Sequence, residues 1–374
     1  MWNHLKKLDW LLIGAAVGLC VISLLELWSI DAGSQITGQV SNYLTRQSIF
    51  LVAGLAAMFF LAFIDARIYR NSSSFLMSLY FLSLVLLVLV LFLSREVRGM
   101  TGWFRFGDFG FAPVELAKFT VILVLAKYFS RRHVEVYRIR HIIASGLYAG
   151  LPIALVLLQP DLGSAIVLAA IWLGVVLLSG MKQRHLAIVM IAGVLVSILA
   201  WSFVFKTYQK ERILTFLNPA KDPLGYSYNL IQSKIAIGSG GFWGKGLGQG
   251  SQGQLNFLPE KHTDFIFSVF AEEWGFFGVS FLLGLYALFF WRLMKIIMAA
   301  GNNFFRLFVS GYAIMVFAQI TINAGMCLGL MPVTGIALPF MSYGGSNLLI
   351  NFMILGVIQN IATQTQIGQI RGEE

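Results

Sequence analysis

The chain has 374 residues, of which 58% are hydrophobic and only 12% are charged, and its mean hydropathy is +0.78. These values lie far outside the range of soluble globular domains and predict an integral membrane protein. The formal net charge of +10 comes mostly from short loops between apolar runs, which is an orientation signal and argues against nucleic-acid binding.

The apolar runs are long and continuous, as in transmembrane helices, and do not alternate as the strands of a membrane β-barrel do. A helix rises about 1.5 Å per residue, so about 20 apolar residues cross the hydrocarbon core of a bilayer. We therefore expect an all-α, polytopic fold with ten transmembrane helices. The expected spans are residues 10–30, 48–64, 75–93, 114–128, 142–158, 164–178, 186–205, 266–291, 305–326 and 346–361.

The first span follows a basic segment without a small-residue cleavage site, which predicts a retained transmembrane helix and not a removed signal peptide. Cys20 and Cys327 show no metal-ligand spacing, and we expect no disulfide between them.

Lys and Arg concentrate in every second loop between the expected spans, for example around Arg70, Arg131 and Lys182. The positive-inside rule places these loops, and with them both termini, in the cytoplasm. The other loops are then extracytoplasmic, and one of them, residues 206–265, is long. We expect residues 1–374 to form a single transmembrane domain with this long loop inside it.

The short external loop of residues 94–113 departs from this charge asymmetry, because it contains Arg95, Arg98 and Arg105 close to Trp103. External cations with aromatic neighbours at a membrane suit an anionic headgroup such as phosphate or pyrophosphate. Binding of ordinary anionic lipid is the alternative.

Pro113, Glu115 and Lys118 have the pattern of a helix start at the outer end of the fourth span. Lys118 follows Glu115 at i,i+3, so the two side chains share a face. They form either a local ion pair that lets the helix end enter lipid, or a site in which Lys118 lines a cavity and Glu115 sets its position and charge.

Asp161 lies in a turn too short to be anything but a connection between two spans. Its side-chain oxygen is placed to cap the following helix, and we favour this role over catalysis. Its carboxylate nevertheless lies at the same outer level as that of Asp264.

Residues 236–250 are rich in glycine, but the Gly-Lys pair in them is followed by Gly and not by Ser or Thr. This spacing excludes a Walker loop and argues against nucleotide hydrolysis. Glycines let a backbone press closely against a ligand or a membrane. A flexible linker is the alternative, against which the interleaved Phe242 and Trp243 argue.

Asp264 has the clearest case for acid–base chemistry. It lies where a polar segment meets an apolar span, and an ionised group there loses hydration worth several kcal/mol unless it is paired or faces a wet cavity. Partial desolvation raises the basicity of such a carboxylate toward a useful value. The alternative is that Asp264 only caps the helix together with Thr263.

Residues 331–346 contain too many prolines and glycines to span a membrane as a helix. Backbone of this kind at membrane depth must be buried in protein or line a cavity, and we expect it to pack beside the active groove. Gln319 and Asn323, at i,i+4 on the ninth span, are expected to act as polar contacts between neighbouring elements.

Several of these motifs together resemble the SEDS family of shape, elongation, division and sporulation proteins. The resemblance covers nearly the whole chain, and the form of residues 257–262 is more similar to the elongation branch than to the division branch. The motifs that carry it are QPDLG at 159–163, LPEKHTDF at 258–265, NAGM at 323–326, PVTG at 332–335 and SYGGS at 342–346.

The resemblance implies ten transmembrane helices in the bacterial plasma membrane and a peptidoglycan glycosyltransferase that polymerises lipid II at its outer face. In the implied reaction, the 4-hydroxyl of one lipid-linked disaccharide attacks the anomeric carbon of the growing glycan and expels undecaprenyl pyrophosphate with inversion. A class B penicillin-binding protein, a transpeptidase, is the implied partner.

Carried onto this sequence, the essential aspartate of the family falls on Asp264, its Glu–Lys pair on Glu115 and Lys118, and its external tryptophan on Trp103. The chain departs from many relatives at residues 112–115, where Ala-Pro-Val-Glu replaces Gln-Pro-Ser-Glu. We expect Asp264 to be the base. The expected substrate-binding residues, with a divalent cation (Mg or Mn) as a further candidate, are Arg46, Trp103, Arg105, Glu115, Lys118, Asp161, Lys245 and Lys261.

Two rival functions would use the same residues without making or breaking a covalent bond. A flippase for lipid-linked precursors would need internal repeats, and none is evident between the two halves of the chain. A non-catalytic scaffold for a partner enzyme would tolerate charge-neutral changes at Asp264 and Lys118.

Overall fold

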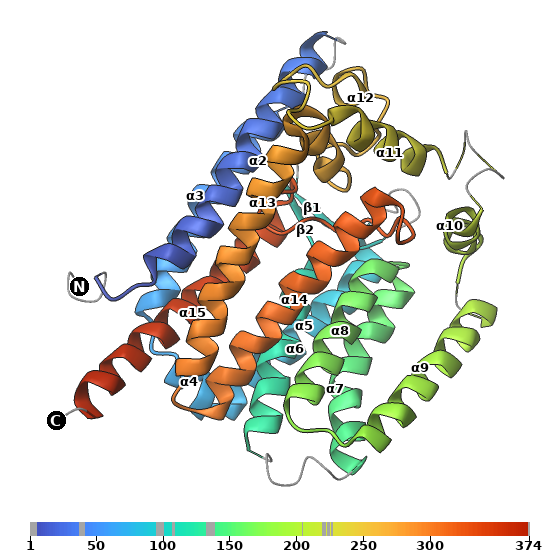
Figure 1. Cartoon of the computed structure of the whole chain (residues 1–374). Helices are drawn as coiled ribbons and strands as arrows, with labels where there is room; N and C mark the ends of the chain where they lie inside the picture. Colours follow the sequence, from blue (N-terminus) through green and yellow to red (C-terminus); the bar gives the residue numbers. More distant parts are fainter. Residues whose placement is uncertain are drawn as a thin grey trace.

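The computed structural model is a bundle of long helices (Figure 1) and describes residues 6–36, 42–94, 101–106, 109–131, 139–203, 205–218, 222, 225 and 227–372. Each of the ten expected spans has a helix in it, which confirms the all-α polytopic fold. These helices are α2 (Trp10–Ile36), α3 (Tyr43–Phe63), α5 (Ser73–Leu93), α6 (Pro113–Ser130), α7 (Ile139–Leu158), α8 (Leu162–Leu178), α9 (Gln183–Phe203), α13 (Ile266–Ala299), α14 (Asn303–Leu328) and α15 (Gly345–Gly372).

Two of the ten helices differ from a plain apolar span. Eight are at least 18 residues long and apolar enough to cross a membrane, whereas α8 has 17 residues. Helix α6 is 18 residues long but includes Glu115, Lys118 and Lys127. It packs against α5, α7, α8, α14 and α15, and most of its residues are buried. Glu115 and Lys118 are tolerated in α6 because they pair with each other inside the protein.

Helix α9 lies apart from the bundle, at the right of Figure 1. Among its described residues only Ala200 is buried. Its exposed side chains are almost all apolar, as expected for a helix whose neighbours are lipid tails. Both cysteines, by contrast, are buried free thiols in the bundle.

The loops that were expected to be external contain secondary structure that the sequence pattern did not reveal. Residues 206–265 include three helices, α10 (Thr207–Leu217), α11 (Tyr228–Gly240) and α12 (Ser251–Gln254). The short loop contains an antiparallel hairpin of β1 (Phe104–Phe106) and β2 (Phe109–Phe111). A further short helix, α4 (Arg67–Asn71), lies at the opposite end of the bundle (Figure 1).

Helix α13 is broken at Gly275, whose φ of 64° and ψ of −162° are not helical. The break leaves helix carbonyls without their usual partners. The amide of Lys245 donates to the carbonyl of Glu272 at 3.0 Å. The next amide, that of Gly246, donates to the carbonyl of Glu273 at 2.9 Å. The glycine-rich loop after α11 thus completes the backbone of the broken helix, as the apolar surroundings require.

The amides beyond the break are paired with the same loop. Phe276 donates to the carbonyl of Gly241 at 3.0 Å, and Phe277 donates to that of Phe242 at 3.1 Å. A Cβ placed on Gly244 would overlap the backbone of α13. The glycines were expected to let the backbone approach a ligand or a membrane, whereas in the structure they let it approach α13.

We predict that Gly275→Ala lowers the free energy of unfolding by about 2 kcal/mol or more, because a Cβ there would overlap backbone atoms of Gly244 and Phe242 and the positive φ adds strain. Thermal unfolding in detergent measures the effect. The matched control is Gly284→Ala in the same helix, where an added Cβ meets nothing within 4 Å. Equal melting temperatures for the two variants would contradict the role of the glycine loop.

Candidate active site

The segment between α14 and α15 has no helix from residue 332 to residue 338 and only turns from there to residue 344, as its sequence predicts. Its polar backbone is paired inside the protein. Asn323 of α14 donates from Nδ2 to the carbonyl of Ile336 at 2.7 Å. Within the segment, the amide of Leu338 donates to Oγ of Ser342 at 2.8 Å. We call residues 331–344 the crossing segment.

Asp264 is fastened to the crossing segment through its backbone. Nδ2 of Asn323, which donates to Ile336, also donates to the carbonyl of Asp264, at 2.9 Å. The carbonyl of Thr263 accepts a hydrogen bond from Ser342 Oγ at 2.6 Å. One amide side chain thus joins Asp264 to Ile336, so Asn323 has the predicted role of a polar contact.

The carboxylate of Asp264 is partly exposed and lies against the crossing segment. Its Oδ2 is 3.3 Å from the position that a Cβ would take on Gly335, whose φ is +76°. The N-cap residue of α13 is Phe265, whose side chain makes no capping hydrogen bond.

Glu115 and Lys118 form the predicted ion pair, with 2.7 Å between Oε1 and Nζ. The Lys118 side chain is 1% exposed and that of Glu115 is 12% exposed. The second oxygen of Glu115 accepts a hydrogen bond from Nδ2 of Asn347 at 3.1 Å. Asn347 lies directly after the crossing segment, so the end of this segment also orients Glu115.

Asp161 caps α8 as predicted, since its Oδ1 accepts a hydrogen bond from the amide of Ser164 at 2.9 Å. Burial raises the pKa of the Asp161 carboxyl. The hydrogen bonds from Ser164 and the charge of Lys118 act in the opposite direction, and the charge of Glu115 adds to the rise. Asp161 therefore lies within electrostatic reach of the ion pair.

The first turn of α8 also rests on the crossing segment. A Cβ on Gly163 would overlap the side chain of Ile336 and approach the carbonyl of Thr334. Asp264 and the residues on either side of Asp161 contact the crossing segment, and Glu115 contacts Asn347 in the first turn of α15, which follows it. Residues far apart in sequence are brought to one end of the bundle in this way.

The hairpin and the start of α3 lie beside this group. Oγ of Ser346 donates to the carbonyl of Gly110 at 3.1 Å, which fastens the hairpin to α15. Trp103 is 46% exposed and lies against Gly110, and Arg105 is exposed. These exposed groups agree with an external, ligand-accessible surface.

Arg46 is half-buried in the first turn of α3. Its neighbour Gln47 accepts a hydrogen bond from the amide of Gly344 at 3.3 Å, which fixes this turn to the crossing segment. The other two predicted cations of the short loop, Arg95 and Arg98, lie outside the described residues.

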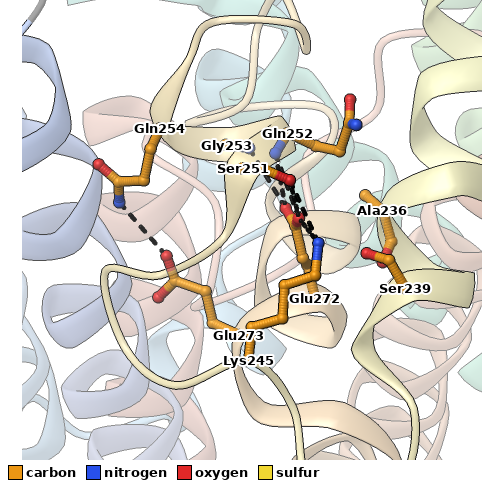
Figure 2. A network of polar contacts seen from close by, with 9 residues as sticks. All are labelled: Ala236, Ser239, Lys245, Ser251, Gln252, Gly253, Gln254, Glu272 and Glu273. Carbon is orange, nitrogen blue, oxygen red and sulfur yellow. Dashed lines mark hydrogen bonds and ion pairs between the residues drawn. The ribbon is translucent and has the colours of Figure 1, made fainter.

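Lys245 does not join this group. Its Nζ lies 2.7 Å from Oε1 of Glu272, a carboxylate that is fully buried (Figure 2). The same carboxylate accepts hydrogen bonds from the amides of Gln252 and Gly253 at the start of α12. The charge of Lys245 is therefore used to neutralise a buried carboxylate, and we leave it out of the site.

Lys261 is also held inside the protein. Its side chain is 7% exposed, and Nζ donates to the carbonyl of Gly253 at 2.6 Å. Burial lowers the pKa of Lys261, against the charges of Asp31 and Glu273. Because its ammonium is bonded to α12, on the side of the loop where Lys245 lies, Lys261 is likewise left out of the site.

Asn347 was missed at the sequence level, although it directly follows the SYGGS motif. A second missed group comes from α10, where Arg212 donates to the carbonyl of Val333 at 3.5 Å and Gln209 donates to that of Pro160 at 3.3 Å. These contacts enclose a cavity of about 20 Å³ beside the turn of Asp161. No local pattern in α10 indicates these contacts.

A metal ion has no evident cage of protein ligands here. Within the part of the chain that the structure describes, no group of three or more His, Cys, Asp or Glu side chains is placed to hold one.

Comparison with known proteins matches residues 8–367 to the family model for FtsW, RodA and SpoVE, described as cell cycle proteins. The peptidoglycan glycosyltransferase MrdB of Escherichia coli K12 is 36% identical, over 98% of this chain and 96% of its own. A chain from a peptidoglycan synthase complex that coordinates polymerization and crosslinking superposes with a TM-score of 0.80 at 36% identity, covering 96% of this chain and 98% of its own. The crystal structure of RodA, the rod shape determining protein of Thermus thermophilus, superposes with a TM-score of 0.68 at 33% sequence identity. The match covers 95% of this chain and 96% of the RodA chain.

We predict that Glu115→Gln lowers the free energy of unfolding by about 3 kcal/mol, because it leaves the buried Lys118 ammonium without a counter-charge. The double variant Glu115→Gln, Lys118→Met removes both charges and is expected to recover part of the loss. Thermal unfolding of the single and double variants measures this coupling. A double variant that loses as much as the two single variants added together would contradict it.

Proposed function

Because the chain belongs to the FtsW, RodA and SpoVE family of cell cycle proteins, we propose that it is a peptidoglycan glycosyltransferase of the plasma membrane that polymerises lipid II during cell elongation. The names of its relatives and the likeness to RodA support this function. The observation that carries it is that the crossing segment and Asn347, which follows it, hold Asp264, the turn of Asp161 and the Glu115–Lys118 pair at one end of the bundle.

Asp264 is the proposed base. As the 4-hydroxyl of the acceptor sugar attacks the anomeric carbon of the donor, its proton passes to the Asp264 carboxylate. A new carbon–oxygen bond forms on one face of that carbon while the bond to the pyrophosphate breaks on the other, so the configuration inverts. A positioned base of this kind contributes about 10²- to 10⁴-fold to a rate.

The cations near the carboxylates suit the departing lipid pyrophosphate. Lys118 has a fixed position through Glu115, and so needs little reorganisation to face new negative charge. Arg105 and Arg46, on the hairpin and on α3, would supply charge closer to solvent. Trp103 offers an exposed aromatic wall beside them.

Asp161, with its raised pKa, is a carboxyl that stays protonated to higher pH than an ordinary aspartate. Its carboxyl lies within electrostatic reach of Lys118 and Glu115. We assign it to substrate binding in addition to its capping role.

The proposed orientation places the Asp264 end of the bundle outside the cell and the α4 end, with both termini, in the cytoplasm. Residues 1–374 form one transmembrane domain in this proposal, and the loop of residues 206–265 carries the catalytic Asp264. A class B penicillin-binding protein is the proposed partner. Its support is the likeness to a chain from a complex that coordinates polymerization and crosslinking.

We predict that Asp264→Asn, which keeps the shape of the side chain and removes its basicity, lowers the rate of lipid II polymerisation by about 10²-fold or more. Purified protein is incubated with lipid II, with and without a chelator, and the glycan is sized.

The control is Asp222→Asn in the same loop, where a carboxylate oxygen accepts a hydrogen bond from the amide of Gly225 at 3.0 Å, which an amide oxygen can accept as well. Polymerisation by Asp264→Asn at the wild-type rate would reject the assignment. Headgroup translocation in liposomes by protein that never polymerises would favour a flippase instead.

A further inference from the structure

A second cavity, of about 170 Å³, lies between α5, α6 and α7, at the end of α6 opposite to Glu115. Helix α5 lines it with the apolar side chains of Leu76 and Met77, and α6 lines it with Val124 and the polar or basic side chains of Lys127, Tyr128 and Arg131. We call this the basic cavity. The length of α6 separates the basic cavity from the candidate active site.

Lys127 is the central group of the basic cavity. It belongs to the last turn of α6 and is only 8% exposed. Within the described ranges of the chain, its ammonium makes no hydrogen bond or ion pair, whereas Arg131 and Arg70 are close enough to repel it. A cation that lines a cavity with only like charges around it is favourably placed to bind an anion.

The lining residues indicate what kind of anion fits. A lining with both apolar and basic side chains matches a molecule with a hydrocarbon part and an anionic head, and not a free ion. Neighbouring side chains of α5 such as Phe75 and Phe81 are exposed on the bundle surface, where lipid lies. Tyr128, whose hydroxyl is 2.9 Å from Nδ1 of His141, is held in place in this lining.

The position of the cavity agrees with a lipid. The loops at this end of the bundle carry the cations that the positive-inside rule places in the cytoplasm, where the leaflet is rich in anionic lipids. Basic pockets between transmembrane helices on this side recognise lipid headgroups. We propose that the basic cavity binds one anionic phospholipid of the inner leaflet, with Lys127 and Arg131 contacting its phosphate and Leu76 and Met77 its first acyl carbons.

The test uses the full-length protein and counts bound lipid by native mass spectrometry during titration with phosphatidylglycerol or phosphatidylcholine. Each positive charge near a lipid surface is worth about a fivefold change in affinity. The double variant Lys127→Met, Arg131→Gln is therefore expected to bind phosphatidylglycerol about 30-fold more weakly than the wild type. Phosphatidylcholine binding is expected to be the same for both proteins.

Two further variants separate lipid binding from damage to the fold. Arg131 is exposed, so Arg131→Gln alone keeps the fold, and we expect it to weaken binding by about fivefold. Lys295→Gln is the matched control, because this cation lies over the ring of Trp291 at 3.9 Å and away from the cavity. It is expected to bind phosphatidylglycerol like the wild type. Polymerisation of lipid II by Arg131→Gln is expected to be unchanged.

Three results would overturn the proposal. The first is equal affinity of the wild type and Arg131→Gln for phosphatidylglycerol. The second is wild-type protein that binds phosphatidylglycerol and phosphatidylcholine equally well. The third is displacement of the lipid by millimolar inorganic phosphate, which would make the cavity a site for free phosphate.

Discussion

The structure depends on one constraint: backbone that leaves the helical conformation within an apolar bundle must find its hydrogen bonds inside the protein. The crossing segment meets it through Asn323, whose amide donates to the carbonyls of both Ile336 and Asp264. Because the same side chain satisfies both carbonyls, the position of Asp264 follows from the pairing of the segment. The candidate site is thus a consequence of how irregular backbone is accommodated.

The break at Gly275 is subject to the same constraint, and it explains why the long loop packs against α13. The glycine-rich stretch supplies amides and carbonyls to the two ends of the broken α13. Buried Glu272 then needs a counter-charge and amide donors, which Lys245 and α12 provide (Figure 2). The loop therefore forms part of the bundle, and its end at Asp264 is held from both α13 and the crossing segment.

Charge is distributed differently at the two ends of α6. At the Glu115 end, the buried cation Lys118 has a carboxylate partner, and Asp161 lies within reach of both. At the other end, Lys127 is surrounded by positive charge alone among the described residues. The first arrangement is the one proposed to meet charge that develops in a reaction, and the second is the one proposed to bind an anionic lipid. One central helix thus separates the candidate active site from the basic cavity.

Sequence by itself determined the ten spans, because a run of about 20 apolar residues is long enough to cross a bilayer wherever it packs. It also determined the Asp161 cap and the Glu115–Lys118 pair, which depend on spacing within one turn of helix. Only the tertiary structure decided that Lys245 and Lys261 serve buried partners and that Asn347 orients Glu115. The tertiary structure alone also brought Asp264 and the turn of Asp161 to the crossing segment. Each of these contacts joins residues that are distant in the chain, so no local sequence pattern could predict them.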